Sequence, residues 1–275
     1  MKKHLLLLAL CTMMCMAASA QTTLDGDMNH DGVLNTSDLT LLIEKILNPD
    51  PEPGTDKYVD LGLSVKWATC NVGAENCYDY GYYFAWGETT GYGLDTSDGH
   101  SFDWANYKWM TKGQSSWEYV NKYQFADGQT SACWYDSNEK FIGDGKKVLE
   151  AADDAATANW GSDWRMPTYD ELSELSNDDN CSWTWYAAGN TEFNGVAGYK
   201  VQSKKTGYTD KYIFLPAAGY RGDSSLSYTG MRGVYWSSSL GEYNSNYARG
   251  LYFSSSHYMT NGNRYYGKSV RPVTK

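Results

Sequence analysis

Asn159-Trp-Gly-Ser-Asp-Trp-Arg-Met-Pro-Thr-Tyr-Asp-Glu-Leu-Ser-Glu-Leu175 is the stretch that decides the fold. Thr168 and Glu171 within it form the pattern T-x-x-E, a capping box that satisfies two backbone N–H groups at a helix entry. Leu172 and Leu175 are three residues apart and therefore share one face of the helix that follows. The stretch predicts a short, well-capped amphipathic helix packed on a core.

The chain on either side of this helix predicts short strands and long loops. Val148–Ala158 is rich in alanine and predicts a second helix just before the capped one. Val59–Ala74 predicts two short strands around a glycine turn, and Tyr80–Glu88 a further aromatic strand. Residues 89–145 show little periodicity and predict long loops. Later strands are expected at Trp183–Tyr186, Gly198–Gln202, Lys211–Leu215, Gly233–Ser239, Ala248–Phe253 and Lys268–Val273.

These elements predict an α+β fold, with two helices packed on small antiparallel sheets and joined by long loops. The string Trp-Arg-Met-Pro-Thr-x-x-Glu-Leu resembles the signature of the formylglycine-generating and C-type-lectin-like superfamily. Together with its neighbours it most resembles the FISUMP (Fibrobacter-type major paralogous) domain of bacterial surface proteins. The matching pieces are Val59–Thr69, Tyr83–Glu88, Asn159–Leu175, Phe214–Arg221, Tyr235–Ser239 and Ser269–Val273. The resemblance covers residues 58–275 and implies a C-type-lectin-like fold in an extracellular domain, without a common biochemical activity.

Composition points to a wet, acidic surface. The chain has 275 residues, a formal net charge of −10, 24 tyrosines and 11 tryptophans. Tyrosine and tryptophan combine an apolar body with a polar tip, which suits binding faces. The negative balance disfavours nucleic acid and anionic membranes as partners.

The first twenty residues have the layout of a secretory signal peptide. Lys2 and Lys3 precede an apolar run from Leu5 to Leu10, and small residues precede Gln21. This layout predicts cleavage after Ala20 and a mature protein that is secreted, periplasmic or on the surface of a bacterium. The apolar run is shorter than the roughly 20 residues that a membrane-spanning helix needs, so the chain is not expected to span a membrane.

Residues 27–38 have the spacing of a calcium-binding loop. Oxygen ligands fall at loop positions 1, 3, 5, 9 and 12, with a backbone carbonyl at position 7 and a glycine at the sharp turn. The expected calcium ligands are Asp27, Asn29, Asp31, Val33 through its carbonyl, Asn35 and Asp38. The loop and the apolar helix after it resemble one dockerin type I repeat, at residues 21–48. A proline-rich linker follows at residues 49–57.

Dockerins normally carry two such repeats, and this sequence has one. A single apolar helix face of this size cannot bury itself alone. We therefore expect the repeat to dock on the main domain, to pair with another chain, or to fold only loosely. The resemblance implies a cohesin-like or self-paired partner.

Enzyme chemistry finds little support in the sequence. Formylglycine-generating enzymes need a pair of reactive cysteines late in the domain, and no cysteine follows Cys181. The G-x-S-x-G motif of serine hydrolases is absent. Glycosidase carboxylates cannot be recognised by spacing, and Asp170, Glu171 and Glu174 are better explained as a cap and a solvated helix face. Cys70, Cys77, Cys133 and Cys181 allow three disulfide pairings after signal cleavage.

Two late stretches have the composition of binding loops, namely residues 243–247 and 257–266. The sugar-binding strings Glu-Pro-Asn, Gln-Pro-Asp and Trp-Asn-Asp of calcium-dependent lectins are missing. Binding of a glycan or a protein through aromatic faces remains open, and the alternative is that these stretches are ordinary turns with half-buried tyrosines. The candidate ligand-binding residues are Tyr243, Tyr247, Tyr258, Arg264, Tyr265 and Tyr266. Arg165 and Arg271 are expected to be structural.

The sequence therefore predicts a non-catalytic binding or adhesion protein with one calcium-binding repeat. The alternative is an accessory or catalytic part of extracellular polysaccharide degradation, which the dockerin-like repeat suggests.

Overall fold

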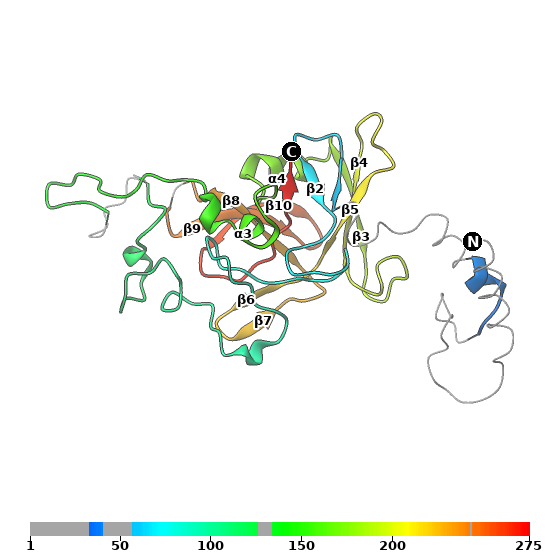
Figure 1. The fold of residues 1–275 in the computed structure, drawn as a ribbon, viewed down its shortest axis with the longest axis horizontal. Coiled ribbons are helices and arrows are strands. Elements are labelled where there is room, and N and C mark those ends of the chain that lie inside the picture. Colours follow the sequence, from blue (N-terminus) through cyan, green and yellow to red (C-terminus); the bar gives the residue numbers. More distant parts are fainter. Residues whose placement is uncertain (1–32, 41–56, 126–133, 243) are drawn as a thin grey trace. The chain divides into compact units, whose positions relative to one another are not determined.

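The computed structural model describes residues 33–40, 57–125, 134–242 and 244–275 (Figure 1). Several expectations lie outside these residues: the signal peptide, most of the linker, Asp27, Asn29, Asp31, Cys133 and Tyr243. The chain divides into two compact units, Met1–Thr55 and Asp56–Lys275. Within the described residues, no helix has the length and apolar character needed to cross a bilayer.

The capped helix is confirmed as α4, Tyr169–Ser176. The Thr168 side chain accepts a hydrogen bond from the Glu171 backbone N–H at 3.3 Å, and the Glu171 carboxylate accepts one from the Thr168 N–H at 2.8 Å. Arg165 donates to the same carboxylate at 2.7 Å. Leu172 and Leu175 are buried, and α4 packs on the strands β9 and β10 described below.

The second helix begins later than its alanine-rich sequence predicts. A short 3₁₀ helix, η3 (Ala151–Asp153), leads into α3 (Ala155–Trp160). Asp154 sets this start, because its side chain accepts hydrogen bonds from the N–H groups of Ala156 and Thr157. Residues 148–150 lie outside the helix, and Val148 makes a β-bridge to Ser239 of β8.

Every sheet is antiparallel, which confirms a mixed α+β fold. The largest sheet has the order β10-β9-β8, and two further three-stranded sheets have the orders β3-β4-β5 and β1-β2-β11. A small hairpin, β6–β7, projects at the lower side of Figure 1. The strands are β1 Tyr58–Val59, β2 Lys66–Ala68, β3 Cys181–Tyr186, β4 Gly198–Ser203, β5 Tyr212–Pro216, β6 Tyr220–Gly222, β7 Ser225–Ser227, β8 Gly233–Leu240, β9 Tyr247–Phe253, β10 His257–Asn263 and β11 Val273–Thr274.

Three stretches differ from the sequence-based expectation. Residues 257–263, expected as a loop, form β10, because each of them pairs with a residue of β9. Lys268–Val273 was expected as a strand, but only Val273 belongs to one, the strand β11. Tyr80–Glu88 was also expected as a strand, but it makes only isolated bridges, at Tyr83 and Phe84. The expected long loops at residues 89–145 are confirmed over the described part, which contains the 3₁₀ helices η1 (Thr96–Asp98) and η2 (Trp117–Tyr119).

Arg264 lies in the interior, and this corrects its expected place in a ligand-binding surface. Its side chain is fully buried. The guanidinium donates to the Tyr107 hydroxyl at 2.9 Å and to the carbonyls of Lys122, Tyr123 and Ser245 at 2.9–3.2 Å. One side chain near the end of the chain therefore fixes several turns of the long loops.

Arg271 has a similar structural role, as expected. It is buried and donates to the carbonyls of Ala68, Thr69 and Phe214 at 2.8–3.0 Å. Its Nε also donates to the Asn71 side chain at 2.9 Å. These bonds connect the end of β2 to the middle of β5 and to the C-terminal segment.

Replacing Arg264 with alanine should lower the free energy of unfolding by at least about 3 kcal/mol, because several buried oxygens lose their donor. The control is Lys211→Ala, since Lys211 pairs with Asp210 and their side chains are 50% and 71% exposed. An exposed pair contributes about 1 kcal/mol or less. Urea denaturation followed by circular dichroism measures both values, and equal losses would contradict the role of Arg264.

Candidate functional site

The hairpin β6–β7 presents two different faces because side chains alternate along a strand. Arg221 points inward, where it is fully buried and donates to both carboxylate oxygens of Asp98 at 2.6 and 3.0 Å. Hydrogen bonding to Arg221 lowers the pKa of Asp98 to about 2. Arg221 also donates to the Gly93 carbonyl at 3.2 Å, so it fixes the neighbouring loop. Tyr220 and Gly222, on the opposite face, are left half-buried.

Tyr220 and Gly222 form part of a row of aromatic rings that we call the aromatic strip. A Cβ at Gly222 would lie 2.9 Å from the Tyr266 ring, so a glycine is needed for the ring to lie against β6. Successive ring centroids of the strip are 4.5–5.9 Å apart. In order, its members are Trp104, Tyr265, Tyr266, Tyr220 and Tyr228.

Tyr228, at one end of the strip, has a strained backbone. Its φ is +61°, in the left-handed region that a bulky side chain rarely adopts. Its carbonyl accepts hydrogen bonds from the N–H groups of Met231 and Arg232, both at 3.0 Å, which hold the turn. The side chain is 41% exposed. Strain of this kind is concentrated at functional sites.

Two tyrosines of the strip, Tyr220 and Tyr265, are uncharged at neutral pH. Burial raises the pKa of Tyr220 and of Tyr265, and a hydrogen bond to Tyr266 adds to the effect at Tyr265. Their hydroxyls therefore keep their protons and can both donate and accept. Neighbouring rings of the strip meet at interplanar angles of 29–71°, so the strip presents ring edges as well as ring faces, with polar tips that can hydrogen-bond to a ligand.

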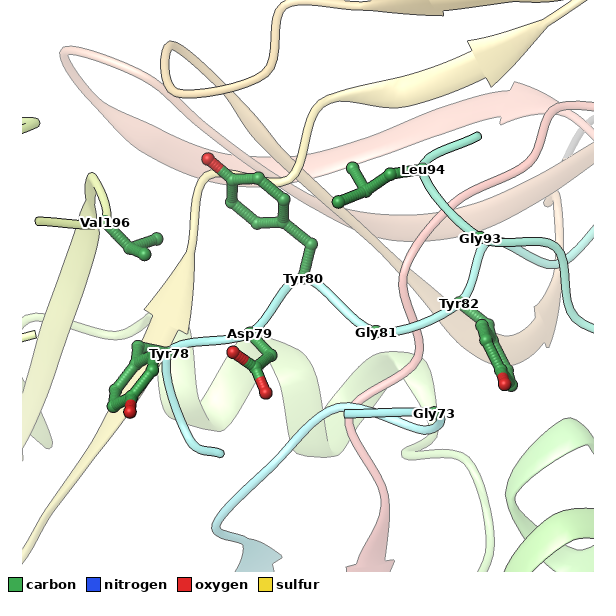
Figure 2. Close-up of a pocket in the computed structure, with 9 residues that line it drawn as sticks. All are labelled: Gly73, Tyr78, Asp79, Tyr80, Gly81, Tyr82, Gly93, Leu94 and Val196. Atoms are coloured by element: carbon green, nitrogen blue, oxygen red, sulfur yellow. The ribbon is translucent and has the colours of Figure 1, made fainter. Parts of the chain in front are cut away.

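A pocket lies beside the loop at residues 73–82, apart from the aromatic strip (Figure 2). Its volume is about 400 Å³. In Figure 2 the side chains of Leu94 and Val196 lie on either side of the Tyr80 ring, and Asp79 points away from that ring. The lining residues are Gly73, Tyr78, Asp79, Tyr80, Gly81, Tyr82, Gly93, Leu94 and Val196.

Two buried arginines position the walls of this pocket. Asn71, which accepts from Arg271, donates to the Tyr80 carbonyl at 2.9 Å and so fixes one wall. The opposite wall, at Gly93 and Leu94, is fixed by the hydrogen bond from Arg221 to Gly93. The pocket is therefore a preformed part of the domain surface.

The structure separates the residues that sequence reasoning grouped as one site. Tyr265 and Tyr266 belong to the aromatic strip, whereas Arg264 between β10 and Tyr265 is buried. Tyr247 pairs with Asn263 and Tyr258 pairs with Tyr252. At about 3.4 Å per residue, the two pairs lie roughly 17 Å apart at opposite ends of the β9–β10 hairpin. Tyr247 and Tyr258 are exposed but do not form one surface with each other.

Sequence reasoning missed Trp104, Tyr220, Tyr228 and Arg232. Arg232 stacks on Tyr228, with the centre of its guanidinium 3.6 Å from the ring centroid. The available signal was the turn Ser227-Tyr-Thr-Gly230, in which a tyrosine stands among turn-forming residues. The contacts to Tyr266 and Trp104 span long sequence separations and leave no local signal.

Three of the expected calcium ligands, Val33, Asn35 and Asp38, lie in the described residues and make local hydrogen bonds. Asn35 caps the helical residues 36–40, because its side-chain oxygen accepts from the Ser37 N–H at 2.7 Å. Asp38 accepts from the Asn35 N–H at 2.8 Å, and its side chain is buried. The Val33 carbonyl accepts from the Asn35 side chain at 3.2 Å. Carboxylate, amide and carbonyl oxygens are the donors that calcium prefers, so these residues fit the ion.

Comparison with family models, with curated proteins and with solved structures finds no match to this chain.

The strain at Tyr228 can be measured by comparing two substitutions at one position. Tyr228→Gly and Tyr228→Ala both remove the ring, but only glycine adopts a positive φ without cost. We expect the glycine variant to be about 1 kcal/mol more stable than the alanine variant. Thermal or urea unfolding of the two proteins gives the difference. An alanine variant as stable as the glycine variant would show that the turn is not strained.

Proposed function

We propose that this chain is a secreted or cell-surface protein that binds a glycan or protein ligand without chemical change, and that the aromatic strip is its contact surface. The observation that carries the proposal is the unbroken row of five aromatic rings that ends in the strained Tyr228.

The energetics of aromatic surfaces support this function. Interfaces derive most of their binding free energy from a few large residues, among which tyrosine and tryptophan are enriched. A ring that is already packed against neighbours loses little conformational freedom on binding, which lowers the cost of association. In the strip, ring–ring contacts and the close approach of Tyr266 to Gly222 provide this preorganisation.

The proposed fold is that of a C-type-lectin-like FISUMP domain at residues 58–275. Small antiparallel sheets, two short helices and long loops support it. The signal-like N-terminus supports export, and the proposed location is the bacterial cell surface or the space outside it.

The contacts of Glu171 and Glu174, two of the carboxylates considered as glycosidase candidates, support a non-catalytic role. Glu171 completes the capping box and pairs with Arg165. Glu174 accepts hydrogen bonds from the backbone and the hydroxyl of Ser64, at 2.5–3.2 Å. Both groups are engaged in local structure rather than directed at the aromatic strip.

The contribution of the strip can be tested with arrays of glycans and of extracellular proteins. Tyr220→Ala and Tyr228→Ala should each weaken binding of whichever ligand the wild type retains by about tenfold or more. Tyr258→Ala is the matched control, because Tyr258 is exposed but lies on the β9–β10 hairpin outside the strip. If the wild type and the three variants bind the ligand with equal affinity, the strip is not the contact surface.

We also propose that the repeat at residues 21–48 binds one calcium ion through Asp27, Asn29, Asp31, the Val33 carbonyl, Asn35 and Asp38. Three carboxylates in twelve residues repel one another without a cation, so binding should order the loop. A cohesin-like protein, or a second copy of the repeat, is the proposed partner of this module.

Calorimetric titration should show one calcium site in the wild type and none in Asp31→Ala. Asp163→Ala, which removes a carboxylate from the main domain, should bind calcium as the wild type does. Magnesium should substitute poorly, because it prefers a small octahedral site and releases water reluctantly. Calcium binding by Asp31→Ala with wild-type affinity would refute the site.

A further inference from the structure

Arg232 differs from the other five arginines of the chain, all of which lie in the described residues. Arg165, Arg221 and Arg249 pair with Glu171, Asp98 and Glu242. Arg264 and Arg271 donate to carbonyls inside the core. The guanidinium of Arg232 makes neither an ion pair nor a hydrogen bond with any described residue, and its recorded contact is the stacking on Tyr228.

The stacking geometry leaves the donors of Arg232 available. A guanidinium lying 3.6 Å above a ring uses its flat face, whereas its N–H groups point outward from its edge. Arg232 is half-buried, so its position is restricted by the protein, and the adjacent Met231 is 63% exposed. The end of the aromatic strip therefore presents a positioned fork of hydrogen-bond donors beside an exposed tyrosine.

We propose that Arg232 and Tyr228 form a subsite for an acidic sugar, whose carboxylate or sulfate group binds the Arg232 guanidinium while the sugar ring lies along the aromatic strip. This inference rests on the proposed function of the strip and names the ligand class. Arginine suits the role because its planar fork matches an oxyanion with two parallel hydrogen bonds.

The local chemistry outweighs the overall charge of the protein. The net charge of −10 repels anions at long range, but charges beyond about 8 Å are largely screened at physiological ionic strength. Among the described residues, the charge of Asp223 acts on Tyr265, toward the other end of the strip. An acidic group is therefore favoured at the Arg232 end, and uncharged sugar units are favoured along the rest of the strip.

Matched probes isolate the acidic group. A galactose oligomer that ends in one galacturonic acid unit differs from the all-galactose oligomer in a single carboxylate, and a galactose oligomer with one sulfated terminal unit tests the second anion. Titration calorimetry of the full-length protein should show at least about tenfold tighter binding of one acidic oligomer than of the neutral one. The acidic oligomer that binds more tightly shows whether the recognised group is a carboxylate or a sulfate.

The variants separate charge recognition from stacking. Arg232→Gln should lose the preference for the acidic oligomer and bind the neutral one as the wild type does. Arg232→Lys keeps the charge without the fork and should show a reduced preference. Tyr220→Ala should weaken both oligomers alike. Arg249→Gln, which changes an arginine already paired with Glu242, is the control and should keep the preference.

The outcomes distinguish this inference from the proposed function. If Arg232→Gln, shown by circular dichroism to be folded, keeps the wild-type preference, the subsite is refuted. If the wild type binds acidic and neutral oligomers equally, the subsite is refuted and the strip remains a glycan surface. If the wild type binds no oligomer, the subsite is refuted, and the proposed function of the strip is restricted to binding protein ligands.

Discussion

Hydrogen bonds from buried guanidinium groups to backbone carbonyls are the interaction on which this domain depends. Most of the described residues between Val59 and Val148 lie outside regular strands and helices, so their carbonyls lack the partners that a sheet or helix supplies. A buried carbonyl without a donor is costly, and nearly all such groups in proteins are paired. Arg264 and Arg271 together donate hydrogen bonds to six carbonyls. Their side chains supply the donors that the backbone N–H groups of a neighbouring strand supply in a sheet.

Arg221 applies the same principle to the candidate site. Because it points inward from β6, its neighbours Tyr220 and Gly222 point outward and form the middle of the aromatic strip. The same guanidinium fixes the loop at Gly93 that forms one wall of the tyrosine-lined pocket. One buried charge therefore positions both features, and the site is built on β6 rather than on a loop alone.

Local patterns in the sequence were sufficient for the elements that depend on local forces. The capping box at Thr168 and the short strands between turns belong to this kind, and both were predicted. The helix start at Asp154 was missed because an aspartate cap outweighs the alanine propensity before it. Arg264 was misplaced because burial of a charged residue depends on partners up to 142 residues away. The strip was predicted only at Tyr265 and Tyr266, since Tyr220, Tyr228 and Trp104 join them through tertiary contacts alone.

The position of these arginines in the chain has a consequence for how the protein is made. Arg264, Arg271 and β11 are synthesised long after their partners, which include Tyr107, Ala68 and β2. The Ala68 carbonyl and its Arg271 donor are 203 residues apart, so at on the order of ten residues per second the carbonyl waits roughly 20 seconds for it. The early half cannot close its core until the late segment has emerged. Until then, the carbonyls that these arginines bind remain without their native donors.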